Sequence, residues 1–404
     1  MTNFNSKVYF YFSSLISLLL FIPVFINSNI GSDWDSYALI GTYENFIKYN
    51  TYIPSRPPGF PTYELLIGLL IYVSEILGTN KEQLLLFFHF LLLISFNYLI
   101  YCFFKQIKNS NFLIYLIIIF SPIYLISGLS IIDYFFGNLF GFLAIYLVLY
   151  LPNQKYQNLY VIIALSLSIS SRLSNLIFLG VIFLYILIKN NDFKLAILVL
   201  VSTLIISSTV YFYFYSNLFA FYKISGIYSS WTEMFCMFNL TNTDHDLINR
   251  LGRFVLKQVP FLGTLGSMLL LTNFLKLDFD IKNKKFYFFL LFLLFELSFL
   301  RLPTEEGHLI PAFIAFMFLI SKSKNKALIV ILISVMLSNF YDLKFYEVDK
   351  IDSASTINLS LNIKEGFLIE DYNLRNTIAL EKLFHYKNSQ VTLYDAWSSG
   401  CPNI

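Results

Sequence analysis

Apolar runs separated by short polar segments recur along the first 340 residues of the chain. Those read as membrane spans lie at 8–26, 84–104, 112–128, 134–151, 159–171, 174–188, 195–215, 259–275, 286–300, 308–320 and 327–340. A helix that crosses a bilayer needs about 17–25 residues, so the shorter runs must borrow flanking residues or sit inside the bundle. The pattern predicts an all-α polytopic membrane protein.

Two apolar stretches allow more than one interpretation. The stretch 159–188 is either one overlong helix or two spans that meet at residues 170–174. The run from Tyr63 to Leu77 carries Glu64 and Glu75 and follows three prolines. Because of these charges, it either crosses the membrane, lies in the interface or re-enters.

The positive-inside rule decides between these readings of 63–77. If this run does not cross, the predicted inner loops hold thirteen lysines, namely Lys7, Lys105, Lys108, Lys155, Lys189, Lys194, Lys276, Lys282, Lys284, Lys285, Lys322, Lys324 and Lys326. If it crossed, all of them except Lys7 would lie outside, against the rule. We therefore predict about 11 transmembrane helices, a cytoplasmic N-terminus and an outer C-terminal tail.

Composition supports a membrane location and excludes some partners. Hydrophobic residues make up 57% of the chain and charged residues 13%, with a mean hydropathy of +0.65. A soluble chain is about one quarter charged. The net charge of +3 is too small to indicate a nucleic-acid partner. The abundance of Lys, Asn, Ile and Phe favours a bacterial inner (plasma) membrane.

The chain divides into a transmembrane domain, 1–340, and an extracytoplasmic tail or small appended domain, 341–404. Its three cysteines lack metal-ligand spacing. Cys236 and Cys401 both fall on the predicted outer side, and whether they pair stays open, whereas Cys102 falls near the inner face.

The six arginines are distributed differently from the inner lysines. All six fall on the predicted outer side: Arg56, Arg172, Arg250, Arg253, Arg301 and Arg375. A planar guanidinium binds phosphate through two parallel hydrogen bonds, whereas lysine is a point charge that suffices to orient a span. The asymmetry predicts an outer-face site for a phosphorylated ligand.

The first outer loop carries the most distinctive polar pattern. Asp33 and Asp35 follow the first span, and Ser32 and Asp35 have the spacing of a capping box for a helix over 36–49. Such a helix would lie flat on the bilayer with an apolar face made of Tyr37, Ile40, Tyr43 and Ile47. The two carboxylates would then lie where a lipid phosphate meets water. The alternative is that they only cap this helix.

Four polar segments, in this order, resemble the GT-C superfamily of membrane glycosyltransferases, which includes protein mannosyltransferases and aminoarabinose transferases. The acidic pair and interfacial helix lead into the rigid turn Arg56-Pro57-Pro58-Gly59-Phe60-Pro61. Ser127–Asp133 is similar to the second acidic turn of that family, and Ser171–Ser174 to its arginine turn. Arg301–Pro311 resembles the late outer turn, although His308 replaces the usual aromatic residue.

The resemblance implies a GT-C type helical bundle with interfacial helices in the first outer loop. It also implies an inverting transfer of a sugar from a polyprenyl-phosphate donor to a lipid, glycan or protein acceptor. Such a displacement needs a base and cations for the leaving phosphate. The implied catalytic residues are Asp33, the first choice as base, Asp35 and Asp133; the implied phosphate- or substrate-binding residues are Arg56, Arg172, Arg301, Glu305 and His308.

The sequence leaves open whether the enzyme uses a metal ion and which reaction it catalyses. Asp33, Asp35 and Asp133 offer hard oxygen ligands for Mg²⁺ or Mn²⁺, but related families divide on metal use, so no cofactor is assigned. An O-antigen polymerase or ligase-like enzyme would rely on a late outer loop with arginines, such as Arg250 and Arg253. A lipid-linked sugar transporter would need charges deep within spans, whereas the acids here lie mostly at span ends.

Overall fold

The computed structural model describes residues 6–26, 28, 34–50, 52, 54–55, 59–151, 156–225, 254–255, 257–258, 261–262, 266–267, 283–301, 306–337, 341–344 and 360–363. Within these ranges the side chains of Ser6, Pro23, Trp34, Asp35, Asn190, 214–225, Arg301, Glu306, 341–344 and 360–363 are not described. All structural statements below concern this part of the chain.

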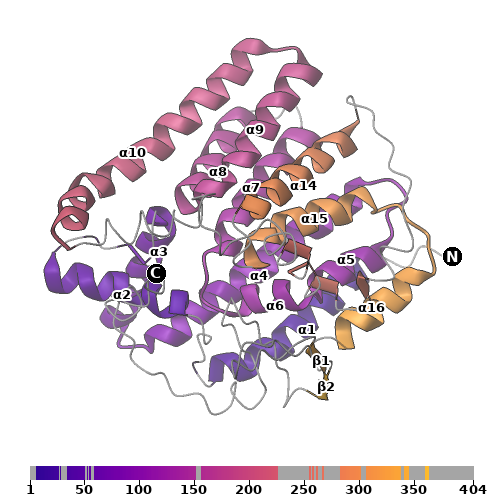
Figure 1. Ribbon diagram of the computed structural model, residues 1–404, viewed down its shortest axis with the longest axis horizontal. Helices are drawn as coiled ribbons and strands as arrows, with labels where there is room; N and C mark the ends of the chain where they lie inside the picture. The colour runs from indigo at the N-terminus through magenta and orange to yellow at the C-terminus, as the bar shows by residue number, and fades with distance from the viewer. Residues whose placement is uncertain are drawn as a thin grey trace, which may run out of the picture.

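Helices make up most of the described chain (Figure 1). They are α1 (Ser6–Ile26), α2 (Trp34–Tyr49), α3 (Pro61–Leu77), α4 (Lys81–Gln106), α5 (Phe112–Ile119), α6 (Pro122–Leu129), α7 (Tyr134–Tyr150), α8 (Gln157–Ser171), α9 (Leu176–Tyr185), α10 (Phe193–Ser225), α14 (Lys284–Arg301), α15 (Ile310–Leu319) and α16 (Ala327–Leu337). Short turns are η1 (Leu173–Asn175), η2 (Ile186–Asn190) and η4 (Glu306–Leu309). The strands β1 (Tyr341–Lys344) and β2 (Ser360–Ile363) pair antiparallel, with Tyr341 opposite Ile363.

The protein is a helical membrane protein. Three described helices are long and apolar enough to cross a bilayer, at Lys7–Ile26, Lys81–Gln106 and Phe193–Tyr213. A fourth follows if α5 and α6 form one bent span, and five shorter apolar helices accompany them. The total of about 11 spans stays a prediction.

The predicted single span over 112–128 is divided into two helices. α5 and α6 meet at an angle of 55° around Phe120 and Ser121. Pro122 explains the break, because proline has no N–H to donate and disfavours helical backbone in the residue before it. A break at this point turns the chain before it reaches the acidic turn at Asp133.

The stretch 159–188 forms two helices, α8 and α9, so it is not one overlong helix, while the crossing of the membrane by each of them stays a prediction. Between them Arg172 has extended backbone, with φ −163° and ψ 113°, and the short turn η1 follows. The N–H of Arg172 still donates to the carbonyls of Ser168 and Ile169, both at 3.0 Å. The helix end is therefore closed while the Arg172 side chain turns away from the helix.

The core of the bundle is aromatic and is built around α4. Phe103 of α4 packs against Phe142 of α7 and Phe318 of α15, with ring centroids 6.3 and 4.7 Å away. Buried hydrogen bonds also join helices, for example from the Tyr124 hydroxyl to Asn97 Oδ1 at 2.8 Å. Such bonds and close side-chain packing stabilise helix association in a bilayer, where the lipid is as apolar as the core.

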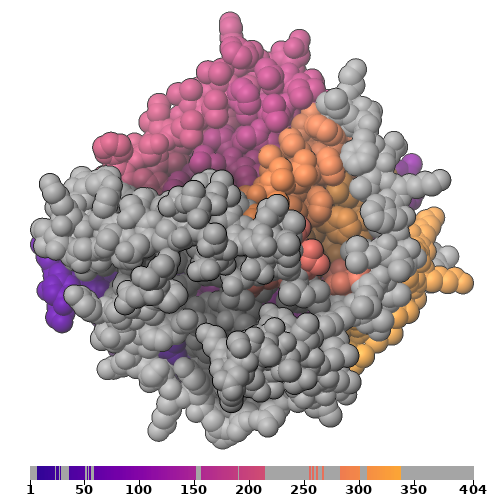
Figure 2. All heavy atoms as spheres, in the orientation of Figure 1, coloured from indigo at the N-terminus to yellow at the C-terminus, as the bar shows by residue number. Residues whose placement is uncertain are grey.

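The helices at the edge of the bundle expose apolar side chains. α10 lies at the upper-left edge of the molecule (Figures 1 and 2) and exposes side chains that include Leu198, Val201 and Ile205. α1 and α16 expose similar side chains, such as Leu19 and Ile333. Surfaces of this kind suit contact with lipid rather than water.

The helix expected over 36–49 is present as α2, which begins at Trp34, while its place in the membrane interface stays a prediction. Its expected apolar face is divided, however: Ile40 is buried while Ile47 is 64% exposed. The buried positions include Leu39 and Thr42, because α2 packs against α3. The exposed apolar side chains of α2 lie at its C-terminal end and are Phe46, Ile47 and Tyr49.

Candidate functional site

Three turns that are far apart in the sequence meet at the side chain of Arg172. Arg172 follows α8, Asp133 precedes α7, and His308 lies in η4 before α15. Arg172 Nη1 donates to Asp133 Oδ2 at 2.5 Å, and Nη2 lies 2.6 Å from His308 Nδ1 and 3.0 Å from its Nε2. The three helix ends therefore form one polar cluster.

The guanidinium is also fixed by its own turn and by two aromatic rings. Arg172 Nε donates to Ser174 Oγ at 3.2 Å. The guanidinium carbon lies 4.1 Å from the ring centre of Tyr134 and 5.9 Å from that of Phe60. Aromatic faces attract cations, and more strongly where water is excluded.

The Arg172–Asp133 ion pair of the cluster is almost completely removed from solvent, whereas His308 is half-buried. The side chains of Arg172 and Asp133 are 6% and 1% exposed. Removing one partner of a buried ion pair leaves an uncompensated charge and costs about 3–5 kcal/mol. Each of the two side chains therefore compensates the buried charge of the other.

Two glycines allow the elements to approach this closely. A Cβ on Gly307 would overlap the ring of Tyr134, and one on Gly137 would lie 2.7 Å from Asn175 Nδ2. Ser168 Oγ donates to the carbonyl of Gly137 at 2.7 Å, which joins α8 to α7. Contact of this kind between small residues is common where membrane helices cross.

The Tyr63 side chain is buried near Asp133, at the edge of the cluster. Its hydroxyl forms a hydrogen bond with His89 Nε2 of α4, and its ring lies 5.7 Å from that of Phe136. Burial raises the pKa of the Tyr63 hydroxyl well above its usual value, and the nearby Asp133 carboxylate raises it further. Tyr63 is therefore a neutral side chain at the edge of the charged cluster.

A second buried acid, Glu64, holds the segment that precedes α3. The Ser55 N–H and Oγ donate to Glu64 Oε1 at 2.7 and 2.5 Å, and the Phe60 N–H donates to Oε2 at 3.2 Å. The Tyr52 hydroxyl donates to the same oxygen. Burial raises the pKa of the Glu64 carboxyl, and the hydrogen bonds from Ser55 and Tyr52 act in the opposite direction.

The cluster contains only some of the residues expected from the sequence. Of these, Asp133, Arg172 and His308 are brought together, and their catalytic roles stay predictions. Asp35 is the second residue of α2 and Arg301 the last of α14, but neither side chain is described. Outside the described residues lie Asp33, Arg56, Glu305, Arg250, Arg253, Cys236 and Cys401. Cys102 is a half-buried free thiol.

Sequence reasoning overlooked the contacts of Phe60, Tyr134 and Glu64. A signal for Glu64 was present, because an acid in an apolar run needs partners. It was interpreted only as an argument against a membrane crossing. Nothing in the local sequence indicates that Tyr134 would face a guanidinium from a helix end 38 residues later.

A metal site is not formed by the described residues alone. Among them no group of three or more His, Cys, Asp or Glu side chains is arranged to bind an ion. Asp133, the one proposed ligand with a described side chain, has its Oδ2 engaged by Arg172. A Mg²⁺ or Mn²⁺ ion at this site would therefore depend on Asp33 and Asp35, and metal use stays open.

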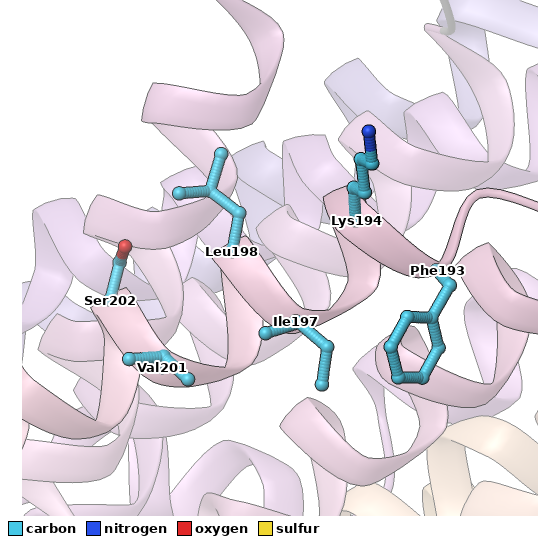
Figure 3. Close-up of a pocket in the computed structure, with 6 residues that line it drawn as sticks. All are labelled: Phe193, Lys194, Ile197, Leu198, Val201 and Ser202. Atoms are coloured by element: carbon cyan, nitrogen blue, oxygen red, sulfur yellow. The ribbon is translucent and has the colours of Figure 1, made fainter.

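A hollow on the surface lies apart from the Arg172 cluster. It has a volume of about 430 Å³ and is lined by Phe193, Lys194, Ile197, Leu198, Val201 and Ser202, all from α10 (Figure 3). These residues are apolar apart from one lysine and one serine, and none belongs to the cluster. The hollow suits a lipid chain beside the bundle better than a polar reaction.

Comparisons with known proteins give little support for an identification. No family model and no curated protein matches the chain. A solved structure of the archaeal oligosaccharyltransferase AglB from Archaeoglobus fulgidus, in complex with an inhibitory peptide and a dolichol-phosphate, is similar with a TM-score of 0.38 and 15% sequence identity. The match covers 83% of this chain and 50% of that chain, so this protein spans about half the length of the AglB structure. A likeness of this degree carries no argument about function.

Proposed function

We propose that this protein is an inverting glycosyltransferase that moves a hexose or pentose from a polyprenyl-phosphate donor to an acceptor hydroxyl on the outer side of the membrane. The observation that carries the proposal is the contact of Arg172 with Asp133 and His308 at the ends of membrane helices. A fixed guanidinium at such a position suits the phosphate of a lipid carrier, whose chain stays in the bilayer.

The Arg172 guanidinium retains capacity to bind a phosphate. It has five N–H donors, and each of its three nitrogens is engaged by one side chain. Among the contacts of the described residues, one donor on Nη1 and one on Nη2 are not used, and we propose that these bind phosphate oxygens. Asp133 and the two rings hold the group in position before the donor binds, so little reorganisation is needed in the transition state.

The reaction is a single displacement at the anomeric carbon. The acceptor oxygen forms a bond to this carbon while the bond from the carbon to the phosphate oxygen breaks, which inverts its configuration. The proton of the acceptor hydroxyl passes to a carboxylate, with Asp33 as the first candidate and Asp35 as the second. Polyprenyl phosphate leaves with the electron pair, and Arg172 and Arg301 stabilise its negative charge.

The proposal is tested by the lipids that accumulate when the protein is removed. In cells that lack it, mass spectrometry should detect a polyprenyl-phosphate sugar that wild-type cells consume. The wild-type chain should restore consumption, and the Asp33→Asn variant should not, because an amide cannot accept the acceptor proton.

Asp192→Asn is the matched control. Its Oδ1 accepts the Leu195 N–H at 2.9 Å at the start of α10, a contact that an amide oxygen can keep. This variant should restore consumption fully. Full restoration by Asp33→Asn would rule out Asp33 as the base and leave Asp35 as the base or a transporter as the alternatives.

A further inference from the structure

We propose that Glu64 is a positioning residue, whose carboxylate holds Tyr52, Ser55 and Phe60 so that the Phe60 ring lies 5.9 Å from the guanidinium carbon of Arg172. The inference rests on the proposed function, since it assigns to Glu64 the placement of the cation that meets the donor phosphate. Glu64 itself does not contact Arg172 through any hydrogen bond found among the described residues.

The Glu64 carboxylate collects its hydrogen bonds from one short segment. All four donors lie between Tyr52 and Phe60, and two of them are backbone N–H groups, those of Ser55 and Phe60. Glu64 is 2% exposed. A buried carboxylate with four donors fixes the backbone around it, because breaking any of these bonds would leave a polar group unsatisfied.

The segment also needs a glycine to reach this shape. Gly59 has φ +89°, a conformation that favours glycine, and an added Cβ would lie 3.0 Å from Pro54 Cβ and 3.1 Å from the Tyr52 hydroxyl. Gly59 therefore lies close to Pro54, Tyr52 and the Glu64 carboxylate, and the next residue is Phe60.

Two contacts connect this segment to the arginine turn. The Phe60 ring lies 5.9 Å from the guanidinium carbon of Arg172. Two residues further on, Thr62 Oγ1 donates to Ser170 Oγ at 2.6 Å, just before Arg172 in α8. Movement of the segment would therefore change the surroundings of the guanidinium without touching its bond to Asp133.

The variant Glu64→Gln tests the role with little change of shape. Each carboxylate oxygen accepts one backbone N–H, Oε1 from Ser55 and Oε2 from Phe60. In either orientation the glutamine NH₂ therefore faces one backbone N–H, which loses its acceptor. Glu75→Gln is the matched control, because Glu75 is in the same helix but is exposed and accepts from the Tyr43 hydroxyl at 2.7 Å.

Two measurements on the full-length protein in nanodiscs test separately whether Glu64 holds the Ser55 and Phe60 amides and whether it affects phosphate binding. Hydrogen–deuterium exchange of the Ser55 and Phe60 amides should become about tenfold or more faster in Glu64→Gln and stay unchanged in Glu75→Gln. Binding of undecaprenyl phosphate, a probe for the leaving group, should weaken about tenfold in Glu64→Gln only.

A double variant tests whether the effect passes through Phe60. If it does, Glu64→Gln should weaken undecaprenyl phosphate binding much less in a Phe60→Leu background than in the wild type. Additive losses, or unchanged exchange and binding in Glu64→Gln, would overturn the proposal. If the wild-type protein does not bind undecaprenyl phosphate, the proposed function fails, and so does the proposed effect of Glu64 on phosphate binding. The exchange rates would still test whether Glu64 holds the Ser55 and Phe60 amides.

Discussion

At the scale of single residues, the central feature is the number of partners that one side chain holds. Arg172 contacts Asp133, His308 and Ser174 through its three nitrogens and lies near the Tyr134 and Phe60 rings. Lysine could not reproduce this arrangement, since its ammonium lacks the planar fork of the guanidinium. The cluster is therefore sensitive to small changes in the residues that surround it.

Gly307→Ala should disturb the cluster by steric pressure alone. The added methyl group would overlap the ring of Tyr134, which is fully buried and cannot move freely. Overpacking of this kind costs about 1–3 kcal/mol. We expect a lower apparent melting temperature in detergent and weaker binding of undecaprenyl phosphate.

Gly180→Ala serves as the comparison for this substitution. Gly180 is an exposed residue within α9, and a Cβ added there would have no neighbouring atom within 4 Å. Alanine is favoured over glycine inside a helix by about 1 kcal/mol, so this variant should melt at the same or a higher temperature. Equal destabilisation of both variants would show that the contact with Tyr134 is unimportant.

At the scale of elements, interruptions of helices bring polar groups into the bundle. The break at Pro122 precedes the turn that carries Asp133, and the break after α8 carries Arg172. Side chains at helix ends can reach partners on other elements, whereas those inside a helix follow its faces. The loops at the opposite ends of the helices are joined as well, through Asn111.

Asn111→Ala should cost more stability than Asn80→Ala. Both residues cap helices: Asn111 Oδ1 accepts the Leu113 N–H at 3.1 Å, and Asn80 Oδ1 accepts the Glu82 N–H at 2.8 Å. Asn111 Nδ2 also donates to the carbonyl of Ser323, 212 residues away, at 2.9 Å.

The lost cap costs about 1 kcal/mol in each variant, and the part-buried bond to Ser323 adds about 0.5–1.5 kcal/mol for Asn111. Asn80 also loses the Gln83 N–H bond to its Oδ1, at 3.1 Å, and a bond to Ser28 at 3.3 Å, but both contacts are exposed. Apparent melting temperatures of the two variants in the same detergent measure the difference. A larger loss for Asn80→Ala would contradict the importance of the link to Ser323.

At the scale of the whole molecule, contacts between loops divide the bundle into two ends. At one end Arg172 meets Asp133 and His308, and Lys81 pairs with Glu44 at 2.8 Å. At the other end the Asn111 N–H donates to the carbonyl of Ser321 at 2.7 Å. The same division follows from the distribution of lysines, although which end is cytoplasmic stays a prediction.

Labelling of single cysteines tests this orientation. In a cysteine-free background, Glu44→Cys should react with a membrane-impermeant maleimide added to intact cells, because α2 is expected outside. Lys108→Cys should react only after the membrane is opened, because the loop after α4 is expected to be cytoplasmic. The reverse pattern would invert the topology and move the Arg172 cluster to the cytoplasmic side.

Much of the candidate site is formed by residues that are far apart in the sequence. The carboxylate of Asp133 and the imidazole of His308 could be proposed from their places in polar turns. Their contacts with Arg172 span 39 and 136 residues, and no local pattern encodes such distances. The contacts of Glu64 were missed for the opposite reason: its partners Tyr52, Ser55 and Phe60 are close in sequence, but only the tertiary structure brings their donors to one carboxylate.

The sequence by itself determined that this protein is a helical membrane protein and where most of the described helices lie, whereas the division of the loops between two sides stays a prediction. These properties follow from hydropathy, helix length and charge, which act on each segment separately. Only the tertiary structure decided that Arg172 pairs with Asp133, that Gly307 lies against Tyr134, and that Glu64 holds Phe60 near the guanidinium. Such contacts arise when helices and turns that are distant in the sequence pack together, and they depend on how well the packed surfaces fit each other.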